Sequence, residues 1–293
     1  MAGSLEGRID GKVALVTGAT KGIGRVTARE LAQRGARVLL VARDRARGEA
    51  TAAEIREASE GRPPDVLVAD LSSRSEVRRL AREVRERTPR LDLLVNNAGA
   101  IFEERKVSAD GLEMTFALNH LAYFLLTLEL LPILEAGSAS RIVNVSSVAH
   151  ERGTIDFDDL QGERGYSMWK AYQQSKLANV LFTRELARRL AGRGVTTNAL
   201  HPGAVASGFG RNGRGFFSRL VAVGAPFLAS PETGARTTLH VATAPELRGV
   251  TGRYFSGYRE KTPSRAARDA AAALRLWQIS ENLTAPSTRL PPP

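Results

Sequence analysis

The sequence predicts an α/β fold built on a doubly wound parallel sheet. Short β-branched or Leu-rich runs alternate with longer amphipathic segments through most of the 293 residues. Strict alternation of strands and helices is typical of this fold class. The strand-like runs are apolar on consecutive residues, and such strands are buried on both faces when helices cover a parallel sheet. We therefore expect helices on both faces of one central sheet.

Six strands are expected, and each of the first five is followed by a helix. The strands are predicted at 13–17, 38–42, 65–70, 92–99, 141–147 and 195–203, and the helices at 23–34, 46–59, 74–87, 111–134 and 168–191. No linker-like change in composition divides the chain, so we expect one domain over residues 1–284. Residues 285–293 are Pro-rich and predict a disordered tail. The Gly-, Arg- and Phe-containing segment at about 204–226 is either a mobile substrate flap or an irregular loop.

Composition excludes several classes of function. The chain has 43% apolar and 25% charged residues, which is ordinary for a soluble globular protein. It has no cysteine, which excludes disulfides, thiolate zinc sites and a cysteine nucleophile and is compatible with a reducing cytoplasm. The four histidines (His120, His150, His201 and His240) lie in unrelated segments, so no metal site is expected.

The net charge of +11 arises from 42 Lys and Arg against 31 Asp and Glu. The arginines are dispersed, and in 78–87 and 184–190 glutamates stand among them at helical spacing. This pattern indicates solvated helix faces with ion pairs and not a nucleic-acid-binding surface. A phosphate-bearing cofactor is a better use for part of the charge.

No membrane span is expected. The N-terminal residues contain no apolar h-region, so they are not a signal peptide. The most apolar stretch, 116–134, is interrupted by Asn119, His120, Glu129 and Pro132. These observations favour a cytoplasmic protein.

A glycine-rich turn follows the first predicted strand. In TGATKGIG (17–24), Gly18, Gly22 and Gly24 precede the first helix. Glycines let the backbone turn tightly and approach a pyrophosphate, and the helix N-terminus offers free N–H groups to it. The sequence therefore predicts a dinucleotide site.

The residues after the second strand indicate which dinucleotide binds. An NAD enzyme usually has a carboxylate there that accepts a hydrogen bond from the ribose 2′-hydroxyl. This chain has Arg43 at that place and Lys21 in the glycine loop, and two cations suit a 2′-phosphate. Asp44 either contacts the ribose or caps the next helix. We expect NADP(H) as the cofactor.

With these features, the chain resembles the short-chain dehydrogenase/reductase family over nearly its whole length, with the Rossmann-like fold that this implies. The motifs are TGATKGIG (17–24), DL (70–71), NNAG (96–99), Asn119 in ALNHLAYFLLT, NVSS (144–147), YQQSK (172–176) and HPG (201–203). The resemblance implies a catalytic group of Asn119, Ser147, Tyr172 and Lys176. It implies cofactor contacts from Gly18, Thr20, Lys21, Gly22, Ile23, Gly24, Arg43, Asp70, Leu71, Asn97, Ala98, Gly99, Tyr172, Lys176, Pro202, Gly203 and Val205.

A narrower resemblance is to the retinol-dehydrogenase-like branch of the family. It rests on RIVNVSSVAH, LQGE (160–163), SKLANVLFTRELARRL and TGRYF (251–255), and on the long insert between Ser147 and Tyr172. Membrane-bound members of the branch carry an N-terminal anchor, which this sequence lacks. A soluble enzyme is therefore expected, and a retinoid substrate is in doubt.

The implied chemistry is hydride transfer between an alcohol or carbonyl and the nicotinamide. Tyr172 would act as acid and base, with its pKa lowered by Lys176 one helical turn away. Ser147 would donate a hydrogen bond to the substrate oxygen, although Ser146 is equally available from the residues alone. Lys176 would also hold the nicotinamide ribose, and Asn119 would position a water that connects Lys176 to solvent. Gln173 and Gln174 are interpreted as spacers.

Several aromatic and apolar residues are expected on the substrate side, or alternatively in the core or a subunit contact. They are Phe157, Tyr166, Met168, Trp169, Phe209, Phe216 and Phe217. They favour a bulky hydrophobic alcohol, aldehyde or ketone. A ketoreductase of a specialised biosynthetic pathway and a non-catalytic NADP(H)-sensing regulator remain as alternatives. A homodimer or homotetramer is possible.

Overall fold

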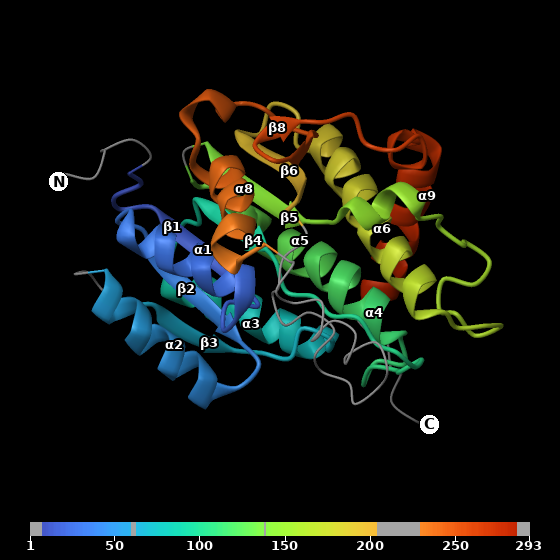
Figure 1. Cartoon of the computed structure of the whole chain (residues 1–293), viewed down its shortest axis with the longest axis horizontal. Coiled ribbons are helices and arrows are strands. Elements are labelled where there is room, and N and C mark those ends of the chain that lie inside the picture. The colour runs from blue at the N-terminus through green and yellow to red at the C-terminus, as the bar shows by residue number, and fades with distance from the viewer. Residues whose placement is uncertain (1–7, 60–62, 138, 204–228, 286–293) are drawn as a thin grey trace, which may run out of the picture.

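One eight-stranded sheet forms the centre of the protein (Figure 1). The computed structural model describes residues 8–59, 63–137, 139–203 and 229–285. The strands are β1 (Val13–Thr17), β2 (Arg37–Ala42), β3 (Asp65–Val68), β4 (Leu93–Asn96), β5 (Ser140–Val145), β6 (Val195–His201), β7 (Tyr254–Ser256) and β8 (Arg259–Glu260). Their order is β3-β2-β1-β4-β5-β6-β7-β8, parallel throughout except for β8 at one edge. This confirms the doubly wound α/β fold.

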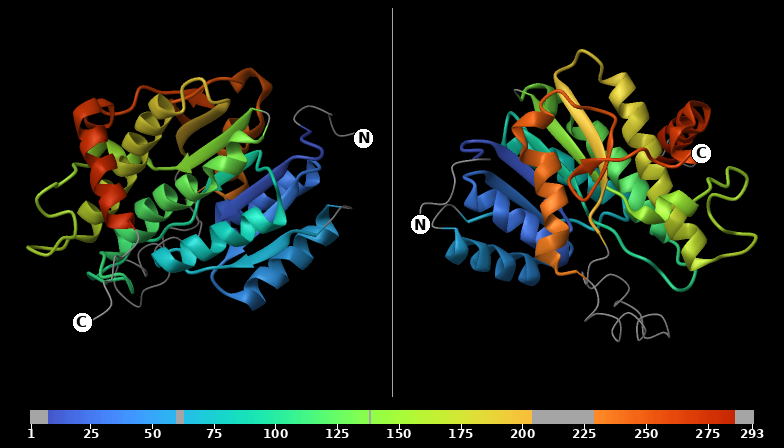
Figure 2. Two further views of the ribbon diagram at one scale, coloured as in Figure 1. Left: turned by 180° about the vertical axis from the view of Figure 1, so that it is seen from behind. Right: turned by 45° about the horizontal axis from the view of Figure 1, so that its top comes forward.

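Helices cover both faces of the sheet (Figures 1 and 2). They are α1 (Gly22–Gln33), α2 (Arg45–Ala58), α3 (Arg74–Arg87), α4 (Met114–Phe116), α5 (Ala122–Glu135), α6 (Met168–Arg189), α8 (Pro231–Thr243) and α9 (Ala270–Thr284). Short 3-10 turns are η2 (Val148–Arg152), η4 (Pro245–Leu247) and η5 (Ala266–Arg268), and η1 (Ala117–Leu121) is a π-helical turn. Helices α1, α2 and α8 lie on one face, and α3, α5 and α6 on the other, with α9 packed outside α6.

The sheet is buried as its apolar runs predict. All five residues of β1 are buried, and so are all four of β4. The register aligns Val16 with Val95 and Asn96 with Asn144, so the carboxyl ends of β1, β4 and β5 meet at one edge. Strands β1, β2 and β3 are added toward one edge of the sheet, and the chain then returns to place β4 on the other side of β1. Ligands of this fold class bind at the point where the strand order reverses in this way.

The C-terminal part of the sheet and its covering helices were not predicted. Strand β7 has three residues and is defined by its pairing with β6, in which Tyr254 aligns with Ala199. The predicted helix over 111–134 is also different, because it starts at Met114 and contains the π turn η1. The expected flap at 204–226, Val205 and the tail from residue 286 onward lie outside the described residues.

The stretch Met114–Glu135 is long and apolar enough, by length and composition, to cross a membrane. Most of it is buried inside the protein, including the polar residues Asn119 and His120. This is the pattern of a core helix. It is the one such stretch within the described part of the chain.

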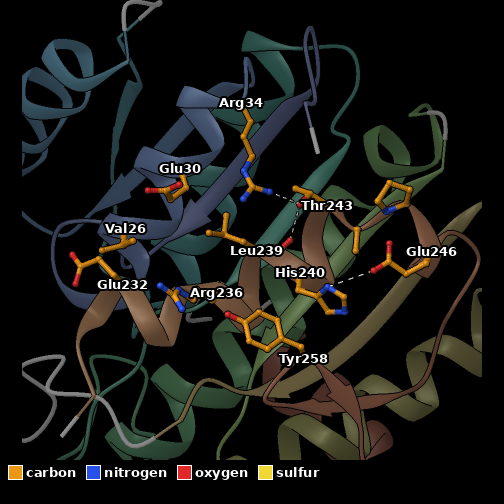
Figure 3. Close-up of a pocket in the computed structure, with 12 residues that line it drawn as sticks. Val26, Glu30, Arg34, Glu232, Arg236, Leu239, His240, Thr243, Glu246 and Tyr258 are labelled. Carbon is orange, nitrogen blue, oxygen red and sulfur yellow. Dashed lines mark hydrogen bonds and ion pairs between the residues drawn. The ribbon is translucent and has the colours of Figure 1, made fainter. Parts of the chain in front are cut away.

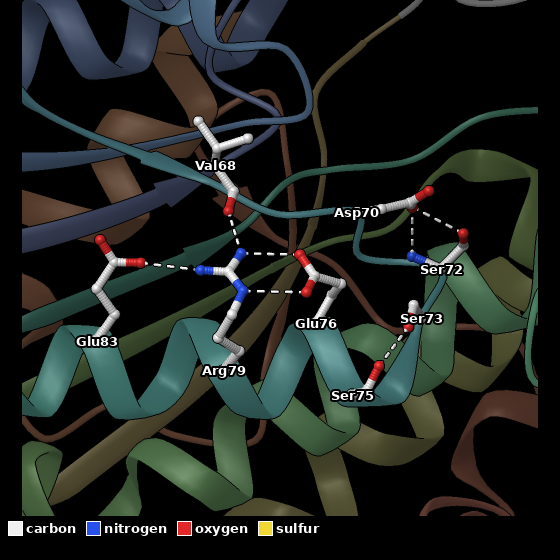
Figure 4. A network of polar contacts seen from close by, with 8 residues as sticks. All are labelled: Val68, Asp70, Ser72, Ser73, Ser75, Glu76, Arg79 and Glu83. Atoms are coloured by element: carbon white, nitrogen blue, oxygen red, sulfur yellow. Dashed lines mark hydrogen bonds and ion pairs between the residues drawn. The ribbon is translucent and has the colours of Figure 1, made fainter.

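The expected ion pairs on the arginine-rich helices are present. On α3, Arg79 contacts Glu76 at 2.8 Å and Glu83 at 3.2 Å (Figure 4). On α6, Glu185 lies 2.7 Å from Arg188 and 2.6 Å from Arg189. Much of the positive charge in these segments is therefore locally paired.

Candidate active site

The glycine loop after β1 is fastened to the segment after β4. The Thr17 hydroxyl accepts hydrogen bonds from the backbone N–H of Asn97 (2.9 Å) and Ala98 (3.0 Å). In return, Asn97 Nδ2 donates to the carbonyl oxygen of Thr17 at 2.8 Å. Two of the motifs predicted to contact the cofactor are thus joined at the switch point of the sheet.

The glycines of this loop leave room that any side chain would fill. Gly18 has a φ of 64°, and a Cβ on it would lie 2.8 Å from Ala98 Cα. A Cβ on Gly24 would lie 2.4 Å from the carbonyl oxygen of Gly18. Helix α1 begins at Gly22, and no side chain caps its first turn. The backbone of Gly18–Gly24 is called the glycine cradle below. Together with the uncapped N-terminus of α1, it fits a pyrophosphate.

Three cations gather beside this cradle. Desolvation, followed by the positive charges of Arg43 and Arg47, lowers the pKa of Lys21, although the Lys21 side chain remains exposed by surface area. Lys21 therefore lies within electrostatic range of both Arg43 and Arg47. Asp44 is the N-cap of α2, with its carboxylate accepting from Arg47 N at 2.9 Å, which favours the capping alternative.

The DL motif lies between β3 and α3 (Figure 4). Asp70 is exposed, and its Oδ1 accepts from the backbone N (2.9 Å) and the hydroxyl (2.7 Å) of Ser72. Leu71 is buried beside it. Asp70 thus shapes the turn into α3, two residues beyond the carboxyl end of β3.

The four expected catalytic residues converge from three elements. Tyr172 and Lys176 lie one turn apart on α6, and Ser147 follows β5 as the N-cap of η2. The Ser147 side chain lies close enough to that of Tyr172 to lower the pKa of the tyrosine. The neighbouring Ser146 is buried, and its hydroxyl donates to the carbonyl oxygen of Lys176 at 2.6 Å. Ser147 is therefore the serine beside Tyr172, and Ser146 fastens β5 to α6.

Lys176 is buried next to Tyr172. Its Nζ donates to the carbonyl oxygen of Val145 at 3.1 Å and lies 5.7 Å from the centroid of the Tyr172 ring. In the protein alone, burial lowers the pKa of Lys176 to about 7 and raises that of Tyr172 to about 12, with the Ser147 side chain opposing the rise. The expected lowering of the tyrosine pKa by Lys176 is thus not present in the protein by itself, because desolvation dominates the pKa of Tyr172 and the opposing contribution comes from Ser147.

Asn119 lies on the π turn η1 and is fully buried. Its Oδ1 accepts from Ala100 N (2.9 Å), and its Nδ2 donates to Ala100 O (2.9 Å) and to the Ser175 hydroxyl (3.0 Å). The Ser175 hydroxyl in turn donates to the carbonyl oxygen of Tyr172 at 2.8 Å. A Cβ on Gly99 would lie 3.1 Å from Asn119 Oδ1 and 3.7 Å from Lys176 Nζ, so this glycine keeps the space above the lysine open.

The HPG turn follows β6. Gly203 has a φ of 95°, which only glycine adopts freely, and Pro202 precedes it. Burial, then the charges of His150 and Lys176, lower the pKa of His201 to about 4, which places this histidine near the lysine. Two further residues were predicted to contact the cofactor. Thr20 lies in the glycine loop, and Ile23 lies in the first turn of α1.

Sequence reasoning missed Gln174, interpreted as a spacer. The residue is buried on the side of α6 opposite Tyr172, and its amide is bonded at both ends to the insert between η2 and α6. Helical spacing could have indicated that it faces away from the site. Its partners could not be read from the sequence, because they belong to an irregular segment.

The insert also contacts the segment that follows Gly99. Tyr166 donates its hydroxyl proton to Phe102 O at 2.9 Å, and Gln161 Oε1 accepts from Glu113 N at 2.6 Å. Trp169 is 47% exposed, and its ring meets that of Tyr172 edge-on with centroids 6.4 Å apart. Met168 begins α6, and Phe157 packs against the guanidinium of Arg275. Phe209, Phe216 and Phe217 lie outside the described residues.

A groove of about 760 Å³ lies elsewhere, between α1, α8 and the turn before β8 (Figure 3). Its lining mixes acidic and basic side chains, among them Glu30, Arg34, Arg236 and Glu246. None of the four converging catalytic candidates lines it. We place the candidate active site at Asn119, Ser147, Tyr172 and Lys176, because the buried lysine lies there and none of the four lines the groove.

The doubly wound sheet and the glycine cradle at its switch point define a dinucleotide-binding α/β protein. The family model described as short chain dehydrogenase matches residues 12–214. Human (Homo sapiens) Retinol dehydrogenase 13 is 45% identical over 295 residues, covering 97% of this chain and 88% of that protein. The chain belongs to the short-chain dehydrogenase/reductase family, in its retinol-dehydrogenase-like branch.

Solved structures agree with this assignment. The crystal structure of an uncharacterized protein from Mycobacterium paratuberculosis has a TM-score of 0.77 and 37% identity, with 96% of each chain covered. A Pseudomonas aeruginosa RhlG/NADP active-site complex has a TM-score of 0.68 and 28% identity, covering 87% of this chain and 97% of that one. The protein is thus an oxidoreductase that acts on CH–OH donors with a nicotinamide cofactor.

Proposed function

We propose that the protein interconverts a hydrophobic alcohol and its aldehyde or ketone, uses NADP(H), and employs Tyr172 as the acid and base. The observation that carries the proposal is that Ser147 and Tyr172 lie next to each other and that the buried Lys176 lies beside the tyrosine ring. The three side chains form a site in which a substrate oxygen can meet a proton donor and a hydrogen-bond donor together.

The choice of cofactor rests on the cations beside the cradle. Lys21 and Arg43 would hold the 2′-phosphate, and the backbone of Gly18–Gly24 would hold the pyrophosphate. Asp44 is engaged as a helix cap, which removes the carboxylate that an NAD site would need at this place. The structurally similar RhlG complex contains NADP, which supports the same choice. When bound, the nicotinamide supplies or accepts the hydride.

The pKa values favour a defined starting state for carbonyl reduction. Because burial raises the pKa of Tyr172 to about 12, its hydroxyl holds its proton at neutral pH and can donate it to a carbonyl oxygen. Ser147 orients that oxygen by donating a second hydrogen bond. Lys176 would hold the ribose hydroxyls and return a proton toward Tyr172, and Asn119 would position a water that connects Lys176 with solvent.

The substrate is proposed to be bulky and apolar. Trp169, in the first turn of α6, is exposed beside Tyr172. Relatives named retinol dehydrogenase make all-trans-retinal one sensible member of a test panel. We further propose a cytoplasmic enzyme with one domain over residues 1–284, consistent with its lack of cysteine, and a homodimer or homotetramer, which sedimentation can measure.

The test is NADPH oxidation with a panel of carbonyls, namely nonanal, cinnamaldehyde, a bulky aromatic ketone and all-trans-retinal. We expect turnover of at least one by the wild type and a loss of about a hundredfold or more in Tyr172→Phe, with NADPH binding by fluorescence unchanged. If both proteins bind NADPH and neither oxidises it with any carbonyl, the chain is a binding protein and the enzymatic proposal fails.

A further inference from the structure

A chain of buried hydrogen bonds joins the C-terminal helix α9 to the π turn η1, which carries Asn119, and to helix α6, which carries Tyr172 and Lys176. His120, next to Asn119 on the π turn, is fully buried, and both of its ring nitrogens have partners. Its Nδ1 lies 3.3 Å from Asn179 Oδ1 on α6, and its Nε2 lies 3.0 Å from the hydroxyl of Ser280 on α9. His120 therefore joins α9 to the π turn by a hydrogen bond, in addition to the apolar contacts between the two elements.

Asn179 continues the chain to the backbone of the active site. Its Nδ2 donates to the carbonyl oxygen of Asn119 at 2.9 Å and approaches that of Val145 at 3.5 Å. The same Val145 carbonyl accepts from Lys176 Nζ at 3.1 Å. One buried amide thus contacts both the carbonyl of Asn119 and the carbonyl that accepts from Lys176.

The donors and acceptors available to Asn179, His120 and Ser280 determine the direction of the hydrogen bonds between them. Both acceptors of Asn179 Nδ2 are carbonyls, so the amide orientation is set and Oδ1 faces His120. His120 must then donate from Nδ1, and as a neutral imidazole it must accept at Nε2. Because Nε2 of this tautomer carries no proton, the Ser280 hydroxyl is the donor in their 3.0 Å contact, in exchange with its donation to Leu276 O at 2.8 Å. Ser280 is therefore the polar partner of the tautomer that Asn179 selects.

The π turn explains why such support is needed. A π turn is rare, and it occurs frequently at functional sites because it aims groups that a regular helix would not. Here it presents Asn119 to Ala100 and Ser175. The ring of His120 also packs against Phe116 at 5.0 Å and edge-on against Phe182 at 6.1 Å, which fixes its position laterally.

We propose that His120, Asn179 and Ser280 are positioning residues for the reaction, and that α9 thereby forms part of the catalytic apparatus and not only of the core. The inference rests on the proposed oxidoreductase function. The three residues hold the carbonyls of Asn119 and Val145, and these in turn fix Lys176 and the turn that carries Asn119. None of the three needs to touch cofactor or substrate.

The experiment compares two hydroxyl deletions on one face of α9. Ser280→Ala removes the donor to His120, whereas Thr284→Ala, one turn further along, removes a buried hydroxyl that donates to Ser280 O at 2.7 Å and does not reach His120. With NADPH and whichever panel carbonyl the wild type reduces, we expect Ser280→Ala to lower kcat by roughly three- to tenfold, with the KM values unchanged. Thr284→Ala should retain wild-type kcat.

Hydrogen–deuterium exchange gives a readout that does not depend on turnover. Amides of residues 117–121 should exchange faster in Ser280→Ala and at the wild-type rate in Thr284→Ala. A second variant, His120→Phe, keeps an aromatic ring among the phenylalanines but loses both hydrogen bonds. The double variant His120→Phe/Ser280→Ala should be no slower in kcat than His120→Phe, because Ser280 acts through the histidine.

Two results would overturn the inference. One is wild-type kcat and exchange in Ser280→Ala, and the other is an equal loss in Ser280→Ala and Thr284→Ala, which would mean that α9 contributes packing alone. Tyr172→Phe, assayed in parallel, separates this failure from failure of the proposed function. If Tyr172→Phe is as active as the wild type, the proposed chemistry is wrong whatever Ser280 does.

Discussion

Gln174 on helix α6 is hydrogen-bonded to Asp156 in the insert between η2 and α6. Its Oε1 accepts from the backbone N of Asp156 at 2.8 Å, and its Nε2 donates to the carbonyl oxygen of Leu160 at 3.1 Å. Since Gln174 lies between Tyr172 and Lys176 on α6, the position of the insert is set by the helix that carries the proton-transfer pair. The insert in turn contacts the segment after Gly99 through Tyr166.

Gln174→Ala should therefore disturb the substrate side more than the cofactor side. Two partly buried backbone hydrogen bonds are lost, at a cost of about 1 kcal/mol of stability each. We expect KM for the carbonyl to rise several-fold while the Kd for NADPH stays unchanged. Gln173→Ala, at the adjacent and less buried position, is the matched control and should behave as wild type. Equal KM values in the two variants would contradict the role assigned to Gln174.

The glycine cradle can be tested by two alanine substitutions with similar backbone cost. Gly18 and Gly111 have φ values of 64° and 79°, so alanine is strained at both, by about 1 kcal/mol. At Gly111 the added Cβ meets nothing within 4 Å, whereas at Gly18 it lies 2.8 Å from Ala98 Cα. Gly18→Ala should weaken NADPH binding at least about tenfold, because the loop must move. Gly111→Ala should bind NADPH normally in the same fluorescence titration.

Cofactor preference separates the neighbouring residues Arg43 and Asp44. Arg43→Ala should reduce the ratio of kcat/KM for NADPH over NADH by about ten- to a hundredfold, since a charge-assisted contact to the 2′-phosphate is lost. Asp44→Ala removes the cap of α2 and should cost about 1 kcal/mol of stability while leaving that ratio unchanged. An unchanged ratio in Arg43→Ala would show that the 2′-phosphate site is elsewhere.

His120 makes the fold sensitive to acid. Burial lowers its pKa to about 4, so protonation favours the unfolded chain, in which a histidine titrates near 6.5. Its contribution to stability is complete above about pH 6.5 and is lost as the pH falls toward 4. At pH 5 the loss is about 2 kcal/mol.

Urea unfolding at pH 7 and pH 5 measures this effect. The wild type should lose about 2 kcal/mol more than His120→Phe between the two pH values. His201, whose pKa is also lowered to about 4, titrates in both proteins and cancels in the comparison. Circular dichroism establishes that the variant is folded. An identical pH dependence in both proteins would show that His120 does not titrate as described.

The predicted and observed elements agree best where a strand or helix is defined by its own residues. Strand β1 was predicted with its observed bounds, because five consecutive apolar or β-branched residues between a Lys and a glycine turn admit little else. The prediction was incomplete at β7, where three residues become a strand only by pairing with β6. Within the helix predicted over 111–134, it missed the start at Met114 and the π turn η1, whose His120 has its partners on α6 and α9.

The sequence by itself determined the fold class, the glycine loop and the Tyr172–Lys176 spacing, because these follow from local periodicity and from residue types at short intervals. The tertiary structure decided which of two adjacent serines meets Tyr172, which of two roles Asp44 takes, and what Gln174 and His120 contact. Those partners lie up to 160 positions apart along the chain. Hydrogen bonds of that range exist only after the sheet has brought its helices together, so no local pattern encodes them.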